Sequence, residues 1–269
     1  MCCNRALAVS SVSGRDRMMT ATSQIPVALL VGGMGTRLRT VLQGTPKPLA
    51  PVGDAPFLEL LILQLHSQGL DKLVMCAGYL AEQIKAEFGD GSRSGVAIRY
   101  SVESQPLGTA GAVKLARPFL QQASHFLVMN GDSFVEIDFD DLLRFHQTHG
   151  GLVSMAVQPV EDAGRYGTVQ IGPSSRVTAF VEKTGVTASG LINAGVYVFD
   201  RAIFDCLPDG PASLERDVFP GVLGKGIFAL PQRGLFIDIG IPEDYARAQA
   251  AFDRLASAAS RASEHKAQP

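Results

Sequence analysis

Apolar and polar residues follow two alternating periods along the first half of the chain. Short apolar runs rich in β-branched residues are followed by longer segments in which apolar residues recur every three or four positions. The runs predict strands at residues 27–31, 73–77, 96–102 and 126–129, and the segments predict helices at 57–68, 80–88, 110–116 and 140–149. This alternation indicates parallel strands with crossover helices. We therefore expect an α/β sheet covered on both faces, with ligands at the carboxyl ends of its strands.

The pattern changes after Gly150. Closely spaced β-rich runs predict strands at residues 153–158, 168–171, 177–182, 191–199, 228–230 and 235–239. Two helices are predicted, at 214–223 and at 242–255, the second with Pro242 in its first turn. The close spacing favours antiparallel additions to the sheet. Because neither a repeat nor a linker interrupts the pattern, we expect one domain over residues 25–258.

The two ends of the chain show neither period. Residues 1–24 mix Ser, Arg and Thr and predict a disordered extension, and residues 259–269, rich in Ala, Ser and charge, predict a flexible tail. Met18 and Met19 stand just before the first predicted strand, so a translation start there is an alternative. No apolar run reaches the roughly 18 residues that a membrane span requires.

Composition narrows the class of partner. The chain is 46% hydrophobic, and its 24 Lys and Arg against 26 Asp and Glu give a net charge of -2 without a long run of either sign. We therefore expect small molecules as partners, and neither nucleic acid nor a membrane. A homo-oligomer is compatible with this composition. The four cysteines show neither metal-ligand spacing nor disulfide density, which indicates the reducing cytoplasm.

A glycine-rich turn follows the first predicted strand. Gly32, Gly33 and Gly35 would let backbone N–H groups approach a phosphate chain, and Arg37 and Lys47 add positive charge. Prolines on both sides fix the backbone of Lys47, which a solvated lysine does not need. The turn is neither the G-x-G-x-x-G of a nicotinamide oxidoreductase nor a Walker A loop.

Two aspartates close apolar runs in the predicted sheet. Asp132 follows residues 126–129, and Asp238 lies within 235–239. An ionised Asp at such a place is costly unless it is paired or binds a metal, although an Asp that caps a turn is the alternative for either residue alone. Because Mg²⁺ prefers a few protein carboxylates plus phosphate oxygens and water, the pair predicts a Mg²⁺ site. The five histidines form no comparable cluster.

These motifs resemble those of the sugar-phosphate nucleotidyltransferases. The resemblance rests on the opening motif Leu30-Val31-Gly32-Gly33-Met34-Gly35-Thr36-Arg37-Leu38 with Pro46-Lys47-Pro48. Within that family the chain is most similar to the D-glycero-α-D-manno-heptose 1-phosphate guanylyltransferases, through Pro48-Leu49-Ala50-Pro51-Val52, Pro56-Phe57-Leu58-Glu59 and the segment from Phe236 to Tyr245. The resemblance covers residues 27–252. It implies a three-layer, Rossmann-like (GT-A-like) fold with a mixed, mainly parallel sheet, a nucleotide-binding half at about 25–150 and a sugar-binding half at about 151–258.

The resemblance also implies roles for single residues. Arg37 and Lys47 would be catalytic, and Asp132 and Asp238 would bind Mg²⁺. The residues implied to bind the nucleotide are Gly32, Gly33, Gly35, Thr36, Gln105, Gly108 and Thr109. Those implied to bind the sugar phosphate are Arg165, Glu182, Lys183 and Asn193. Gln105 departs from the glutamate that some guanylyl enzymes of the family carry before Pro-Leu-Gly.

The implied reaction transfers a nucleoside monophosphate from NTP to a sugar 1-phosphate and releases pyrophosphate. GTP and the heptose 1-phosphate are the favoured substrates, which would yield GDP-heptose for surface polysaccharides such as capsule. Three alternatives stay open. One is the same chemistry on UTP with N-acetylmuramate 1-phosphate or on GTP with mannose 1-phosphate, the second is a non-catalytic regulatory relative, and the third is the oxidoreductase, which lacks the required spacing.

Overall fold

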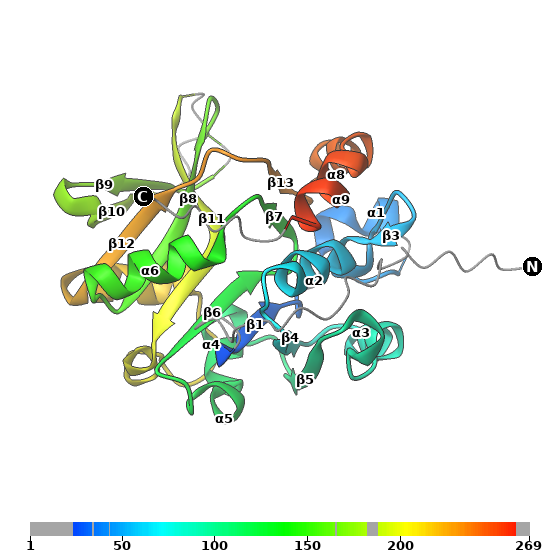
Figure 1. The fold of residues 1–269 in the computed structure, drawn as a ribbon, viewed down its shortest axis with the longest axis horizontal. Helices are drawn as coiled ribbons and strands as arrows, with labels where there is room; N and C mark the ends of the chain where they lie inside the picture. Colours follow the sequence, from blue (N-terminus) through cyan, green and yellow to red (C-terminus); the bar gives the residue numbers. More distant parts are fainter. Residues whose placement is uncertain (1–23, 34, 43, 165, 182–187, 262–269) are drawn as a thin grey trace, which may run out of the picture.

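A nine-stranded sheet forms the centre of the computed structural model, which describes residues 24–33, 35–42, 44–164, 166–181 and 188–261. Seven strands run in the order β10-β9-β11-β6-β1-β4-β5, and β8 pairs with β11 and with β12. Strands β10 and β5 are the two ends of this order, and Figure 1 shows β9 and β10 at one end of the molecule and helices on both sides of the strands.

The first half of the chain is built as the alternating pattern predicts. Strands β1 (Val27–Leu30), β4 (Lys72–Ala77), β5 (Ala97–Val102) and β6 (His125–Asn130) are all parallel. The intervening helices are α2 (Phe57–Ser67), α3 (Ala81–Phe88), α4 (Gly108–Leu115) and α5 (Arg117–Leu120). The prediction of parallel strands with crossover helices is confirmed.

The second half extends the sheet mainly with antiparallel strands. The long strand β11 (Gly190–Asp200) pairs antiparallel with β6 and with β8 (Val153–Val160), and β12 (Ile227–Pro231) pairs parallel with β8. Strands β9 (Thr168–Ile171) and β10 (Val177–Val181) form an antiparallel hairpin beside β11. The sheet is therefore mixed, as expected, with helix α6 (Phe139–His149) packed on β8.

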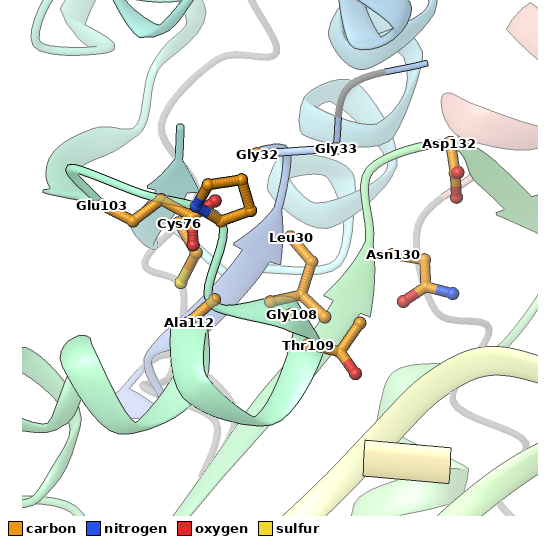
Figure 2. Close-up of a pocket in the computed structure, with 11 residues that line it drawn as sticks. Leu30, Gly32, Gly33, Cys76, Glu103, Gly108, Thr109, Ala112, Asn130 and Asp132 are labelled. Carbon is orange, nitrogen blue, oxygen red and sulfur yellow. The ribbon is translucent and has the colours of Figure 1, made fainter. Parts of the chain in front are cut away.

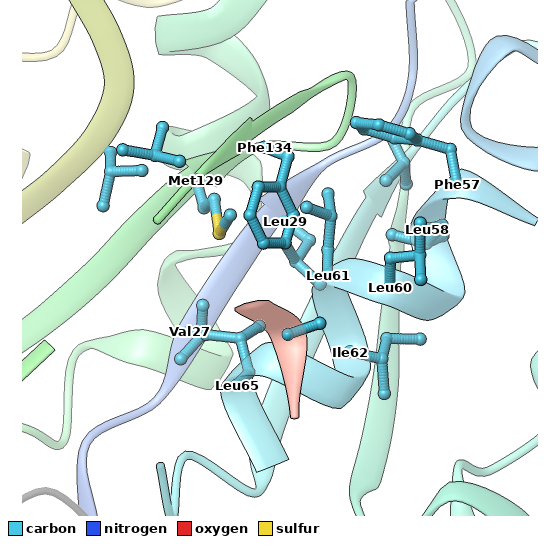
Figure 3. Packing of buried hydrophobic residues seen from close by; sticks show 14 of the residues in the cluster. Val27, Leu29, Phe57, Leu58, Leu60, Leu61, Ile62, Leu65, Met129 and Phe134 are labelled. Carbon is cyan, nitrogen blue, oxygen red and sulfur yellow. The ribbon is translucent and has the colours of Figure 1, made fainter. Parts of the chain in front are cut away.

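Two apolar clusters cover the two faces of the sheet. Because successive strand residues point to opposite faces, Val27 and Leu29 of β1 join one cluster and Ala28 joins the other. Figure 3 shows the first cluster, in which the leucines of α2 meet Leu29, Met129 and Phe134. The second contains residues of α4 together with Tyr197. Burial on both faces explains why the inner parallel strands β1, β4 and β6 have nearly continuous apolar sequences.

Two small ribbons lie outside the main sheet. Strand β7 (Ser133–Val135) pairs with β13 (Phe236–Asp238), and β2 (Pro51–Val52) pairs with β3 (Ala55–Pro56). The remaining short helices are η2 (Thr36–Leu38), α1 (Arg39–Leu42), η3 (Lys47–Leu49), η4 (Ser92–Ser94), η5 (Pro173–Ser175), η6 (Arg201–Asp205) and η8 (Leu223–Lys225).

Two predicted helices differ in detail. The helix predicted at 214–223 is a π-helical segment η7 (Leu214–Val218) followed by α7 (Phe219–Val222), because Pro220 has no N–H to continue a regular helix. The helix predicted at 242–255 is two helices, α8 (Pro242–Ala250) and α9 (Phe252–Ala259). The break at Ala251 allows the apolar face of α9 to pack on α2.

The last helices also hold the β2–β3 ribbon. Tyr245 Oη and Gln249 Nε2 each donate to the Pro51 carbonyl at 2.6 Å, and Gly53 N donates to Gln249 Oε1 at 3.0 Å. Figure 1 shows α8 and α9, in orange to red, beside α1, α2 and β3. Among the described residues, no helix has the length and apolar character that crossing a bilayer requires.

Candidate active site

A cavity of about 310 Å³ opens at the carboxyl ends of β1 and β6. The chain leaves these two neighbouring strands in opposite directions along the sheet, which is where open α/β sheets bind ligands. The lining residues, most of them labelled in Figure 2, are Leu30, Gly32, Gly33, Cys76, Glu103, Pro106, Gly108, Thr109, Ala112, Asn130 and Asp132. The structure thus places Gly32, Gly33, Gly108, Thr109 and Asp132 around one cavity.

The rest of the glycine-rich turn leads away from this cavity toward Lys47. Gly35 lies directly beside the Lys47 side chain. Arg37 is exposed on η2, and the contacts of the described residues do not join it to Lys47. The backbone of Thr36 belongs to the same short helix, whereas its side chain lies outside the described part of the structure.

Lys47 and the two predicted metal-binding aspartates form one cluster. Lys47 Nζ lies 2.5 Å from Asp132 Oδ2 and 3.9 Å from Asp238 Oδ1. The pairing of β7 with β13 brings the aspartates together, since Asp238 is opposite Ser133 and Ile239 N donates to the Asp132 carbonyl at 2.9 Å. Residues far apart in sequence therefore meet at the edge of the cavity.

The cluster has the electrostatic character of a cation site. Burial raises the pKa of Asp238 to about 6, the negative charge of Asp132 adds to this effect, and Lys47 opposes it. Asp238 Oδ1 is buried and accepts no hydrogen bond from the described residues. The described residues contain no set of three or more His, Cys, Asp or Glu arranged for a metal. Two carboxylates fit Mg²⁺, which completes its shell with water and phosphate oxygens.

Glu103 is a cavity residue that our sequence interpretation missed. It lines the cavity from the loop after β5, whereas Gln105 is exposed and is not among the lining residues. Leu107 N donates to Glu103 Oε2 at 3.1 Å, and burial raises the pKa of Glu103. A Cβ at Gly78 would lie 2.5 Å from Glu103 Oε1, so this glycine makes room for the carboxylate. Its position at the carboxyl end of a parallel strand was the available signal.

The structure describes one of the four residues that are predicted to bind the sugar phosphate. Asn193 is half-buried in β11 and donates through Nδ2 to Tyr197 Oη at 2.6 Å. Arg165, Glu182 and Lys183 lie outside the described residues. The roles of all four in binding the sugar phosphate stay predictions.

Three features occur together at this site: a cavity where the chain leaves β1 and β6 in opposite directions, a glycine-rich turn, and a lysine between two aspartates. Together they indicate a protein of the class that binds a polyanionic nucleotide at the edge of a mixed α/β sheet. The chain belongs to the nucleotidyl transferase family, whose model matches residues 27–254. This confirms the family expected from the sequence motifs.

Relatives within the family are similar over most of this chain. It is 39% identical over 224 residues to D-glycero-alpha-D-manno-heptose 1-phosphate guanylyltransferase of Aneurinibacillus thermoaerophilus, covering 82% of this chain and 95% of the relative. It is 37% identical over 234 residues to mannose-1-phosphate guanylyltransferase of Mycobacterium tuberculosis, covering 86% of this chain. The match spans 65% of the length of the mycobacterial relative.

A solved structure supports the same fold. HddC from Yersinia pseudotuberculosis complexed with GMP-PN is 33% identical, with a TM-score of 0.75 over 85% of this chain and 99% of that chain. The mixed, mainly parallel nucleotidyltransferase fold expected from the resemblance is therefore confirmed.

Proposed function

We propose that this protein transfers GMP from GTP to a sugar 1-phosphate, releasing pyrophosphate and forming a GDP-sugar. The observation that carries the reaction class is the cluster of Lys47, Asp132 and Asp238 at the edge of the cavity. Family membership supports it. We place the reaction in the cytoplasm, because thiols such as those of Cys76 and Cys206 stay reduced there.

The chemistry requires no general base from the protein. A sugar 1-phosphate is already an anionic oxygen nucleophile, so the barrier lies in bringing two polyanions together in line at the α-phosphorus. Lys47 supplies a fixed ammonium group, and the N–H groups of the glycine-rich turn supply donors for phosphate oxygens. Asp132 and Asp238 would hold Mg²⁺, which supplies charge neutralisation at the phosphates when bound.

Glu103 supports guanine as the base. A carboxylate in the cavity can accept from both the ring N1–H and the 2-amino group of guanine. Uracil offers a single ring N–H, and adenine offers none beside its exocyclic amine. Both relatives reported above are named guanylyltransferases, which agrees with this choice.

The sugar is the finer part of the proposal, and we favour D-glycero-α-D-manno-heptose 1-phosphate, for surface polysaccharide synthesis. The relative matched over 95% of its length carries that name. Mannose 1-phosphate is the second candidate because the mycobacterial relative is named for it. Mannose 1-phosphate should react more slowly than the heptose, since a smaller sugar leaves a gap rather than a clash.

The decisive experiment is a matrix of four NTPs against several sugar 1-phosphates, with pyrophosphate release as the readout. We expect GTP with the heptose 1-phosphate to be fastest. Preference for UTP with every sugar would contradict the guanylyl assignment. Faster turnover of mannose 1-phosphate would contradict the heptose assignment alone.

The metal assignment has its own test. Asp132→Ala or Asp238→Ala should lower pyrophosphate release by orders of magnitude while the protein stays folded, because each removes a ligand from a two-carboxylate site. Asp141→Ala, which replaces an exposed carboxylate on α6, is the matched control. Near-normal rates for either site variant at saturating Mg²⁺ would remove the assignment.

A further inference from the structure

Glu215 is hydrogen-bonded to a residue of the nucleotide cavity although it does not line the cavity itself. Its Oε2 accepts from Thr109 Oγ1 at 3.1 Å and from Ser213 Oγ at 2.8 Å. The Thr109 oxygen in turn accepts from Leu214 N at 2.7 Å. Thr109 lies in the first turn of α4, so Glu215 fixes the orientation of a cavity side chain.

The other carboxylate oxygen of Glu215 reaches the second half of the protein. Glu215 Oε1 accepts from Tyr197 Oη at 3.1 Å, and Tyr197 Oη accepts from Asn193 Nδ2 at 2.6 Å. The pairing of β11 with β8 shifts register between Asn193 and Tyr197, which is a β-bulge of the kind found next to active sites. The network therefore holds the irregular part of β11.

This bulge lies against the cavity. Gly195 within it has φ 75°, and a Cβ there would lie 2.5 Å from Asn130 Nδ2, which belongs to a cavity-lining residue. Gly195 N also donates to Asn193 Oδ1 at 3.0 Å. A shift of Asn193 would therefore be transmitted to the wall of the nucleotide cavity.

The chemistry of the network requires a carboxylate at its centre. The Asn193 amide donates to the Tyr197 oxygen, so the hydroxyl proton points to Glu215. Burial, together with the nearby charge of Glu215, raises the pKa of Tyr197 well above its usual value and keeps it a donor. Three O–H groups thus converge on one anion, and such charge-assisted bonds are stronger than neutral ones. Glu215 lies on η7, and π-helical segments often occur at functional sites.

We propose that Glu215 is a positioning residue that couples the two substrate sites: it fixes Thr109 on the nucleotide side and, through Tyr197, Asn193 on the sugar side. The sugar-side part rests on the proposed function, which assigns Asn193 to the sugar phosphate. A substrate that orders Thr109 or Asn193 then also orders part of the other site through Glu215. The second substrate therefore loses less conformational entropy when it binds, and the two substrates bind cooperatively.

The test compares Glu215→Gln with the unsubstituted full-length chain, using the NTP and sugar 1-phosphate that give the fastest pyrophosphate release. Glu215→Gln should raise the KM of both substrates by about fivefold, the effect of losing one net hydrogen bond. Tyr197→Phe, which interrupts the network on the sugar side and leaves the Glu215–Thr109 bond in place, should raise the KM of the sugar 1-phosphate more than that of the NTP. Because both changes interrupt one network, the double variant should show no further increase in that KM.

Asp217→Asn is the matched control. Asp217 is exposed on the same π-helical segment and accepts from Ser213 N, away from Thr109 and Tyr197. Its two KM values should stay unchanged.

Unchanged KM values in Glu215→Gln, with or without a lower melting temperature, would overturn the inference, since a purely structural role predicts that result. If Glu215→Gln does not fold, the Tyr197→Phe variant tests the inference instead. An unchanged KM of the sugar 1-phosphate in that variant overturns the coupling. If the unsubstituted protein releases no pyrophosphate with any pair, the proposed function fails. In that case the inference is tested by measuring GTP affinity by calorimetry. Glu215→Gln must still bind GTP more weakly than the unsubstituted protein, and equal affinities overturn the inference.

Discussion

Lys47 stands where a positive charge balances two carboxylates. Its ammonium nitrogen contacts Asp132 and lies within 3.9 Å of the otherwise unpartnered Oδ1 of Asp238. The same two carboxylates are the ones that we propose to hold Mg²⁺. Lys47 and a divalent cation are thus expected to compete for the aspartates until nucleotide phosphates draw the lysine away.

This competition predicts the behaviour of Lys47→Met without nucleotide. The variant should bind Mn²⁺ at least about tenfold more tightly than the unsubstituted protein, because the internal cation is gone. It should also use GTP poorly. Mn²⁺ titration followed by electron paramagnetic resonance measures the affinity. Lys85→Met on α3 is the control, and equal or weaker Mn²⁺ binding by Lys47→Met would contradict the competition.

Glu103 gives a prediction about base choice. If its carboxylate accepts from N1–H and the 2-amino group, the protein should prefer GTP over ITP, which lacks that amino group, by about tenfold in kcat/KM. Glu103→Gln should bring the ratio close to one, because the carboxamide presents a donor to these donors. Gln105→Ala, in the exposed part of the same loop, should keep the ratio. An unchanged ratio in Glu103→Gln would show that another group reads the base.

Among the elements, those with a clear period could be predicted and the short ones could not. Strand β9 was predicted at its observed bounds, and α2 within one residue, because each has a long or regular apolar pattern. Strands β7 and β2 have only three and two residues and carry no period. The candidate site depends on such pieces. The sequence indicated Asp132 and Asp238 separately, but the β7–β13 pairing that joins them to Lys47 appears only in the structure.

The contact of α6 with β8 gives a pH-dependent prediction. His146 is buried there, its Nδ1 lies 2.9 Å from Ser154 Oγ, and burial, with a smaller effect of His125, lowers its pKa to about 4. Between pH 6.5 and 4 the histidine of the unfolded chain takes up a proton that the folded protein does not. Its contribution to stability is therefore complete above about pH 6.5 and falls as the pH drops, by about 2 kcal/mol at pH 5.

Urea unfolding at pH 7.5 and pH 5 measures this effect. The drop in unfolding free energy should be smaller in His146→Gln than in the unsubstituted protein by about that amount. Comparing the two proteins removes the opposite contribution of Asp238, whose raised pKa makes the fold bind a proton as the pH falls toward 4. Equal drops in the two proteins would show that His146 does not carry the dependence.

At the scale of the whole molecule, the last described helix completes the core around the first ones. Leu255 of α9 is fully buried in the cluster that contains α2, and Ser67 Oγ of α2 donates to the Ala259 carbonyl at 3.0 Å. Leu255→Ala should lower the free energy of unfolding by about 2 to 5 kcal/mol, because it leaves a cavity in a packed core. Asp253→Ala on the exposed face of α9 should have little effect. Chemical denaturation measures both, and similar losses would contradict this role for the apolar face of α9.

The clamp that α8 forms on the β2–β3 ribbon bears on how the protein is made. During translation the glycine-rich turn, Lys47 and Asp132 leave the ribosome early, whereas Asp238 and the side chains of Tyr245 and Gln249 that hold Pro51 emerge more than a hundred residues later. The nascent chain therefore carries Lys47 and Asp132 for more than a hundred residues before Asp238, the second carboxylate of the cluster, is made. A chain cut short before residue 238 contains the parallel strands β1, β4, β5 and β6 but lacks one of the two carboxylates that we propose to hold Mg²⁺, so we expect it to be inactive.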